Sequence, residues 1–229
     1  MFQTFLFLQH VPTNLEPAAE PQSIIGMLLE GSMFGLIIII LLIIMSFVAF
    51  FIFIERYLTI KRASQIDDNF MNNIRMNVQT GNIQAARSLC QNTDSPIARM
   101  VEKGLMRIGK PLDDIEHAIE NVGRLEIYKM EKNVNILAII AGVSPMFGFL
   151  GTIAGMIQTF ASLSTANNLS ISVIAGGIYV KMFTSGIGLI VGIMAFIFYN
   201  YLNTLIDRVI NQMENSTFSF IDLLQEPTN

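Results

Sequence analysis

Charged residues are scarce in this chain, and several long stretches contain none. Asp, Glu, Lys and Arg make up 14% of the 229 residues, hydrophobic residues make up 52%, and the mean hydropathy is +0.52. This balance is typical of a membrane protein. The net charge of −4 provides no basic surface of the kind that nucleic-acid binding requires.

Cysteine and histidine are nearly absent as well. Cys90 is the only cysteine, which excludes an internal disulfide and a cysteine-rich metal cluster. His10 and His117 are isolated in the sequence, and the acidic residues within 113–116 fit the start of a helix better than a metal site. We therefore expect no enzymatic activity, no cofactor and no metal site.

Lys and Arg are absent before Arg56. A cleavable signal peptide needs a positively charged start, so residues 1–30 are not expected to be one. They fit a periplasmic N-terminal segment better. Its first residues suit a short amphipathic stretch at the membrane surface, with Phe2, Phe5 and Leu6 as the apolar contacts.

Three stretches with little or no charge are long enough to cross a bilayer. Residues 33–54 contain no charge and can cross the hydrocarbon core once. A second apolar run occupies 136–163, and a third occupies 171–206 with Lys181 as its only charge. The third would be roughly 54 Å long as a helix, so we expect it to project beyond the bilayer, to tilt, or both. The sequence therefore predicts three transmembrane helices.

The distribution of basic residues sets the expected orientation. Twelve of the 14 lie between Arg56 and Lys132, one is Arg208 and the last is Lys181. Basic residues concentrate on the cytoplasmic side of membrane proteins. We therefore expect the segment between the first two spans and the C-terminal tail to be cytoplasmic, which gives an N-out, C-in arrangement.

The cytoplasmic segment has the pattern of consecutive helices. A mixed-charge stretch from residue 55 predicts a helix that stops at Gly81. A second short helix follows, a third begins at Ser95 and Pro96, and a fourth begins with acidic residues in its first turn. No proline follows before Pro145, so we expect the fourth helix to continue into the membrane as one rod, with Pro145 as the site of any kink. The third span should likewise continue as a cytoplasmic helix.

The predicted fold is an all-α membrane protein whose long helices extend from the membrane into a helical cytoplasmic domain. The expected order is a periplasmic N-terminal segment (1–30), a first span (31–54), the cytoplasmic domain (55–133), a second span (134–163), a periplasmic loop (164–170), a third span (171–206) and a cytoplasmic tail (207–229).

Small and hydroxyl-bearing residues recur at helical spacing on the last two spans. On a helix each set shares one face within roughly 80°. Such faces usually pack closely against another helix, and their hydroxyls usually bond a carbonyl four residues earlier, which is the alternative to a functional role. Two such faces on adjacent spans also call for more partners than one chain supplies, which predicts a ring of subunits. The second span contributes Ser144, Gly148, Thr152, Gly155 and Thr159, with Gly151 as a packing residue, and the third contributes Gly177, Lys181, Ser185, Gly188, Gly192 and Tyr199, with Thr184 at its margin.

Lys181 is a charge inside an apolar span. An unpaired charge there costs on the order of 3 kcal/mol or more, so such a residue marks a candidate functional site. Two alternatives remain open. The side chain could reach toward the outer interface, or it could pair with Glu30 near the outer end of the first span.

Acidic residues and histidine are absent between Asn133 and Ile206. A proton relay needs a group that changes its protonation state, which Thr and Ser do not do. If this protein moves protons, the titrating carboxylate is therefore expected to come from another chain.

Three stretches resemble the proton-channel family of ExbB, TolQ and the flagellar stator protein MotA. The run "SPMFGFLGTIAGMIQTF" is similar to the family's second-span signature, "GIYVKMFTSGIGLIVGIMAFIFYNYL" is similar to its third span, and "GNIQAARSLCQNTDSPIAR" is similar to a cytoplasmic pattern. The resemblance covers roughly residues 30 to 210. It is closest to ExbB and TolQ, which have three spans and an outside N-terminus, whereas MotA-like chains have four.

The resemblance implies a homopentamer in the bacterial inner membrane around a central pore. The pore would hold ExbD- or TolR-type single-span partners, each with one essential Asp, and a TonB-type protein is a further expected partner besides membrane lipid. Such a motor uses the proton-motive force to energise transport or envelope processes at the outer membrane. The family's second-span threonine corresponds to Thr152 and its third-span threonine to Ser185, while the position of a frequent third-span glutamate holds Val180. Together with Thr184 and Lys181, Thr152 and Ser185 form the expected proton pathway.

A non-conducting membrane scaffold is the alternative function. It would oligomerise and anchor cytoplasmic partners through residues 55–133. The small-residue faces would then serve packing alone, and Lys181 would extend toward the outer interface.

Overall fold

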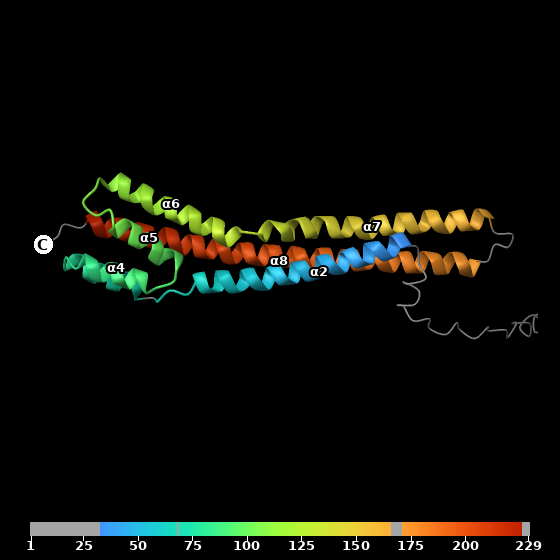
Figure 1. The fold of residues 1–229 in the computed structure, drawn as a ribbon, viewed down its shortest axis with the longest axis horizontal. Coiled ribbons are helices and arrows are strands. Elements are labelled where there is room, and N and C mark those ends of the chain that lie inside the picture. Colours follow the sequence, from blue (N-terminus) through green and yellow to red (C-terminus); the bar gives the residue numbers. More distant parts are fainter. Residues whose placement is uncertain (1–32, 68, 166–170, 226–229) are drawn as a thin grey trace, which may run out of the picture.

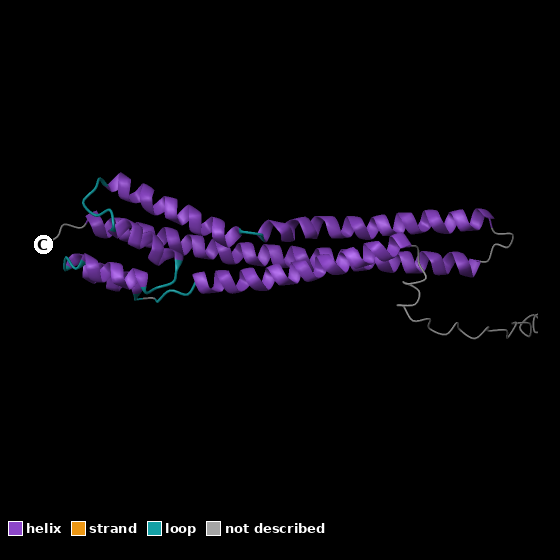
Figure 2. Cartoon of the chain, viewed as in Figure 1, coloured by secondary structure: helices purple, strands orange, loops and turns teal. Residues whose placement is uncertain are grey.

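The chain forms an elongated helical bundle. The computed structural model describes residues 33–67, 69–165 and 171–225, and within these ranges all regular structure is helical (Figure 2). Helix α8 runs along the whole bundle, with α2 and α7 beside one part of it and α3 to α6 around its C-terminal part (Figure 1). The helices are α2 (Met33–Ala63), α3 (Phe70–Gln79), α4 (Ile83–Gln91), α5 (Pro96–Leu105), α6 (Leu112–Glu131), α7 (Val134–Thr165) and α8 (Ile171–Gln225).

Among the residues that the structure describes, three helical segments are long and apolar enough to cross a membrane, in agreement with the three predicted spans. They are Gly35–Ala63, Leu112–Ser164 and Lys181–Gln225. Large apolar side chains point outward from all three, including Phe47 on α2 and Phe149 on α7. Such exposure suits contact with lipid. The predicted N-terminal segment, including Phe2, Phe5, Leu6 and Glu30, and most of the predicted loop at 164–170 lie outside the described residues.

The fourth cytoplasmic helix does not run into the membrane as one rod, contrary to the prediction. α6 ends at Glu131, and α7 begins at Val134 after a break at Lys132 and Asn133. Asn133 has a φ of 64°, in the left-handed region that asparagine tolerates better than most residues. Pro145, by contrast, lies inside α7. The change of direction between the two parts of the chain therefore occurs at an asparagine and not at the proline.

The helix predicted from residue 55 to Gly81 is also interrupted. α2 ends at Ala63 and α3 begins at Phe70. Between them the Asp67 carboxylate accepts a hydrogen bond of 2.9 Å from the Asn69 backbone N–H, a local bond that competes with continued helix. The interruption turns Phe70 into the core, where it is 3% exposed. The predicted stop is confirmed, because Gly81 follows α3 with a φ of 75°.

The other predicted helix boundaries are confirmed. The Ser95 hydroxyl accepts a bond of 3.1 Å from the Ala98 N–H, and Pro96 occupies the first turn of α5. α4 begins in the same way, with Asn82 as its cap. α8 continues as a single helix of 55 residues to Gln225.

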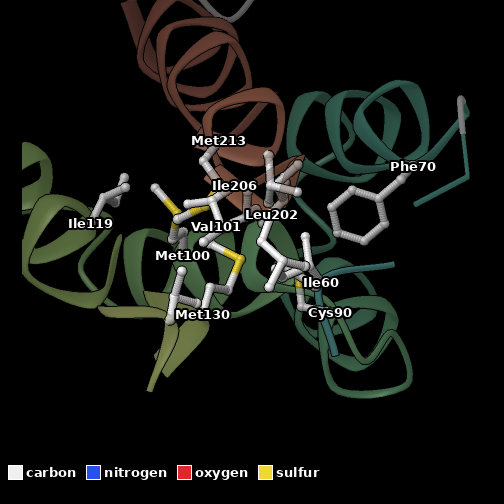
Figure 3. Packing of buried hydrophobic residues seen from close by; sticks show 14 of the residues in the cluster. Ile60, Phe70, Cys90, Met100, Val101, Ile119, Met130, Leu202, Ile206 and Met213 are labelled. Carbon is white, nitrogen blue, oxygen red and sulfur yellow. The ribbon is translucent and has the colours of Figure 1, made fainter. Parts of the chain in front are cut away.

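Side chains from α2 to α6 meet the C-terminal part of α8 in one apolar core (Figure 3). Phe220 is fully buried, and a Cβ atom placed on Gly104 would lie 2.5 Å from its ring. Only glycine lets α5 and α8 approach this closely. Met100 fills the comparable space beside Gly123. The end of α8 is therefore locked to α5 and α6.

An ion cluster joins α5 to α6 beside this core. Glu126 is 4% exposed and accepts hydrogen bonds of 2.7 Å from both Arg99 and Lys129. Arg99 also binds Asp94 on the surface. Burial by itself would raise the pKa of Glu126, but the hydrogen bonds and charges of Arg99 and Lys129 hold it below its usual value. Buried Arg56 donates to the Lys129 carbonyl at 3.0 Å, so α2 is tied to the same place.

Low pH is expected to weaken the ion cluster between α5 and α6. The pKa of Glu126 is lower in the folded protein than the ordinary carboxyl pKa of 4.5. The ionised Glu126 side chain therefore stabilises the fold above pH 4.5, and this stabilisation is lost as the pH falls through the pKa of the folded state. Glu126→Gln should lower the thermal unfolding midpoint at neutral pH and reduce the difference between neutral and acidic midpoints, as measured in detergent by circular dichroism. Glu116→Gln, at an exposed site on α6, is the matched control. Equal acid sensitivity in both variants would contradict the assignment.

Candidate functional site

The small-residue faces of α7 and α8 pack against each other within one chain. A Cβ atom placed on Gly188 would lie 2.7 Å from the Ser144 carbonyl oxygen and 2.8 Å from the Gly148 Cα. A Cβ on Gly148 would lie 3.0 Å from the Ser185 carbonyl oxygen. The backbones therefore touch at this crossing, as small residues in membrane helices allow. These faces already pack against each other within one chain, so their packing does not by itself require the predicted ring of subunits.

The line along which α7 and α8 contact each other is called the seam below. Further along it, larger side chains fill the spaces beside glycines. The Pro145 ring lies against Gly192, 2.7 Å from where a Cβ would be. At Gly151 the space is filled by the Thr184 methyl group and by Ile38 of α2. Thr184 is 3% exposed. Gly151, Gly188 and Gly192 are thus packing residues in this structure, as are Gly148 and Gly155.

Lys181 crosses from α8 over Gly155 of α7. Its methylene groups occupy the space of the missing Gly155 side chain, and its ammonium nitrogen lies 3.9 Å from the position of a Cβ on Gly35 of α2. Glycine at 155 thus makes room for the lysine stem among three helices. Gly35 lies in the first turn of α2, and both α7 and α8 extend beyond the start of α2 (Figure 1). Glu30, its predicted alternative partner, lies outside the described residues.

Thr152 and Ser185 lie on the side of the seam that faces away from α2. Successive residues turn by about 100° on a helix, so Thr152 and its neighbour Gly151 lie on opposite sides of the seam. The same holds for Ser185 and Thr184. Because the Gly151 side contacts Ile38 of α2, the two hydroxyls share the other side. Both residues are half-buried, and the Thr152 hydroxyl donates to the Phe149 carbonyl at 2.7 Å.

That same side carries an apolar groove of about 430 Å³ between α7 and α8. Its lining comes from these two helices alone and includes Gly142, Pro145, Gly192 and Phe196. The sequence pattern gave no sign of this groove, because Gly142 and Pro145 lie off the small-residue face. The signal that could have shown it is their spacing of three residues, which places both on one side of α7.

An aromatic cluster between α2 and α8 was also missed from the sequence. Phe53 and Phe198 stack with ring centroids 4.1 Å apart, and Tyr57 and Tyr201 continue the row. Such pairs stabilise by about 0.5–1.5 kcal/mol beyond the area they bury. The cluster holds α2 against α8, opposite the groove side, so α2 leaves the Thr152–Ser185 side open.

Cys90 is a buried free thiol on α4. Burial and, secondarily, the negative charge of Glu102 raise the pKa of the Cys90 thiol to about 12, so it stays protonated at neutral pH. Among the residues that the structure describes, no cluster of His, Cys, Asp and Glu could hold a metal ion.

Residues 92–215, more than half of the chain, match the model of the MotA/TolQ/ExbB proton channel family. The chain belongs to this family. The match includes α5 to α7 and most of α8, and therefore the whole seam with Thr152 and Ser185. The members of this family are proton-channel proteins.

Individual relatives agree with the family match. The Tol-Pal system protein TolQ of Haemophilus influenzae is 34% identical over 57% of this chain and 50% of its own length. TolQ of Pseudomonas aeruginosa is 26% identical over 58% of this chain and 60% of its own. The biopolymer transport protein exbB1 of Vibrio cholerae is 28% identical over 43% of each chain. The chain thus spans about half the length of the curated relatives it matches.

Proposed function

We propose that this chain is the channel subunit of an inner-membrane motor driven by the proton-motive force, with an N-out, C-in arrangement. The observation that carries the proposal is the placement of two hydroxyls, on Thr152 and Ser185, on the side of the α7–α8 seam that α2 leaves open. This side contains no acid between residues 133 and 206, so it suits a partner that brings its own carboxylate.

The proposed partner is an ExbD- or TolR-type single-span protein with one Asp in its span, and a TonB-type protein joins the complex. Protons enter from outside and neutralise this Asp. Thr152 and Ser185 hydrogen-bond the carboxylate or the waters that serve it, so they hold its charged form more strongly than its neutral form. Neutralisation then releases the partner helix, which rotates to the next subunit of a pentameric ring. The output is mechanical work at the outer membrane.

Native mass spectrometry of the complex tests this proposal. Coexpression with a single-span protein that carries one Asp should give a pentamer of this chain with the partner bound. A stable monomer in mild detergent, or failure to retain any such partner, would overturn the proposal. The ring rests on family membership and on the open side of α7 and α8, since the small-residue faces are occupied within one chain.

Lys181 lies over Gly155 with its ammonium toward Gly35 of α2, and we propose that its charge acts across the α7–α8 contact, without touching the partner's Asp, to set when that Asp takes up a proton. A nearby positive charge lowers the pKa of a carboxyl group, so removing it should raise the pH at which the Asp is neutralised. We expect Lys181→Met to shift the pH dependence of proton-driven activity upward or to weaken partner retention, while Glu30→Gln should have the smaller effect. Activity against external pH is the measurement. A silent Lys181→Met combined with an impaired Glu30→Gln would show that the lysine does not serve the pathway.

A membrane scaffold is the second candidate, and one observation favours it. The glycines of α7 and α8 pack against each other in the chain, as a purely structural role requires. Proton uptake by vesicles that contain the complex separates the two functions. A scaffold would give the same uptake as empty vesicles, whereas the motor subunit with its partner would increase it.

A further inference from the structure

A polar pocket of about 450 Å³ opens where α6 passes into α7. The break at Asn133 separates the two helices and exposes both charges of the adjacent pair Glu131 and Lys132. The amides of Asn135 and Asn203 also line the pocket. It therefore presents one cation, one anion and neutral hydrogen-bonding groups within a single depression.

The apolar groove between α7 and α8 continues from this pocket. Tyr199 lines both, so one aromatic side chain joins the polar and apolar parts. From there the groove follows α7 from Ala138 to Pro145, a length of roughly 10 Å. Apart from the Tyr199 hydroxyl, its lining has no polar side chain.

We propose that the pocket and the groove together bind one phospholipid whose headgroup carries both a phosphate and an amine. Lys132 and the amides of Asn135 and Asn203 donate to phosphate oxygens, and the Glu131 carboxylate accepts from the amine. One acyl chain lies in the groove along α7 and α8. The adjacent opposite charges match a zwitterionic headgroup, whereas a purely anionic one would face Glu131 unfavourably.

The position of the site favours a lipid over a second copy of the chain. The pocket lies where the apolar α7 gives way to the charged α6, which is the level of phospholipid headgroups in a protein that spans the membrane. Tyrosine is enriched at this level because its ring is apolar and its hydroxyl is polar. The proposal goes beyond the motor function and does not depend on it, since lipid binding is measured without a proton gradient.

Two glycines allow a matched test of the groove. Gly142 lines it and Gly186 on α8 does not, yet a Cβ on either would meet nothing within 4 Å. The full chain is reconstituted with a mixture of phosphatidylethanolamine and phosphatidylglycerol, extracted, and analysed by native mass spectrometry for retained lipid. Gly142→Leu should reduce retained phosphatidylethanolamine by about tenfold, because excluding even a pair of methylene groups loses that much affinity. Gly186→Leu should retain the wild-type amount. Equal retention in the two variants would overturn the proposal.

A second pair of variants tests the headgroup. Lys132→Gln should lower the retention of both lipids, because both carry the phosphate that Lys132 binds. Glu131→Gln should reduce the preference for phosphatidylethanolamine over phosphatidylglycerol, and Lys61→Gln, which removes a cation beside the Tyr57 ring on α2, should do neither. Retention of both lipids without preference in the wild type would overturn the zwitterionic assignment. If Gly142→Leu disrupts subunit assembly while lipid retention stays unchanged, the occupant is a second copy and the proposal is wrong.

Discussion

Replacing Thr152 by valine is expected to abolish proton-driven activity while the complex still assembles. Valine has nearly the shape of threonine, so the substitution removes the hydroxyl and little else. A hydrogen bond to a charged group contributes about 1.5–3 kcal/mol, which corresponds to a loss of roughly tenfold to a hundredfold in the step it serves. Activity in cells with a matched measurement of complex yield checks the prediction.

Thr159→Val is the control for this experiment. Thr159 lies on α7 as well, and its hydroxyl bonds the Gly155 carbonyl at 2.9 Å, much as the Thr152 hydroxyl bonds the Phe149 carbonyl. A loss of activity that came only from this local bond would affect both variants equally. Normal activity of Thr152→Val at wild-type yield would show that Thr152 is a structural residue.

Gly188→Ala should sharply reduce the yield of folded protein. The added methyl group would meet backbone atoms of Ser144 and Gly148, and neither can move without separating α7 from α8. Overpacking of this kind typically costs about 1–3 kcal/mol, and the rigid backbone on the opposite helix places this site at the upper end. The thermal unfolding midpoint in detergent and the monodisperse fraction after extraction are the measurements.

Gly186→Ala provides the comparison, because a Cβ at Gly186 meets nothing within 4 Å. Alanine is favoured over glycine in a helix by up to about 1 kcal/mol, so this variant should be as stable as the wild type or more stable. If Gly188→Ala behaves like Gly186→Ala, the close crossing of α7 and α8 is not what holds the two helices together.

The sequence was sufficient for features that depend on local chemistry. Uncharged length identified the three apolar helices, and the start of α5 followed from Ser95 and Pro96, which suit the first turn of a helix. The breaks at Lys132 and after Ala63 were not predicted. They contain no proline or glycine, and they coincide with the local Asp67–Asn69 hydrogen bond and with the left-handed φ of Asn133, which the sequence pattern does not single out.

In the candidate site, too, local patterns were predictable from the sequence and tertiary contacts were not. Helical spacing placed the glycines, Thr152, Ser185 and Lys181 along the facing surfaces of α7 and α8, since it depends only on the period of the helix, and the functional roles of these residues stay predictions. Spacing could not show which surface each face meets. That depends on how α7 and α8 cross, so the contact between Gly148 and Gly188 and the course of the Lys181 stem over Gly155 emerged only in three dimensions.

The uninterrupted course of α8 has a mechanical consequence. At 55 residues it is roughly 80 Å long, and it acts as a stiff lever between the membrane and the far end of the molecule. A tilt of about 5° at one end would displace the other by roughly 7 Å over that length. The break at Asn133 gives α7 a joint that α8 lacks. Any movement of the α7–α8 pair would therefore reach α5 through α8. The contact between Phe220 of α8 and Gly104 of α5 is where the two helices are coupled.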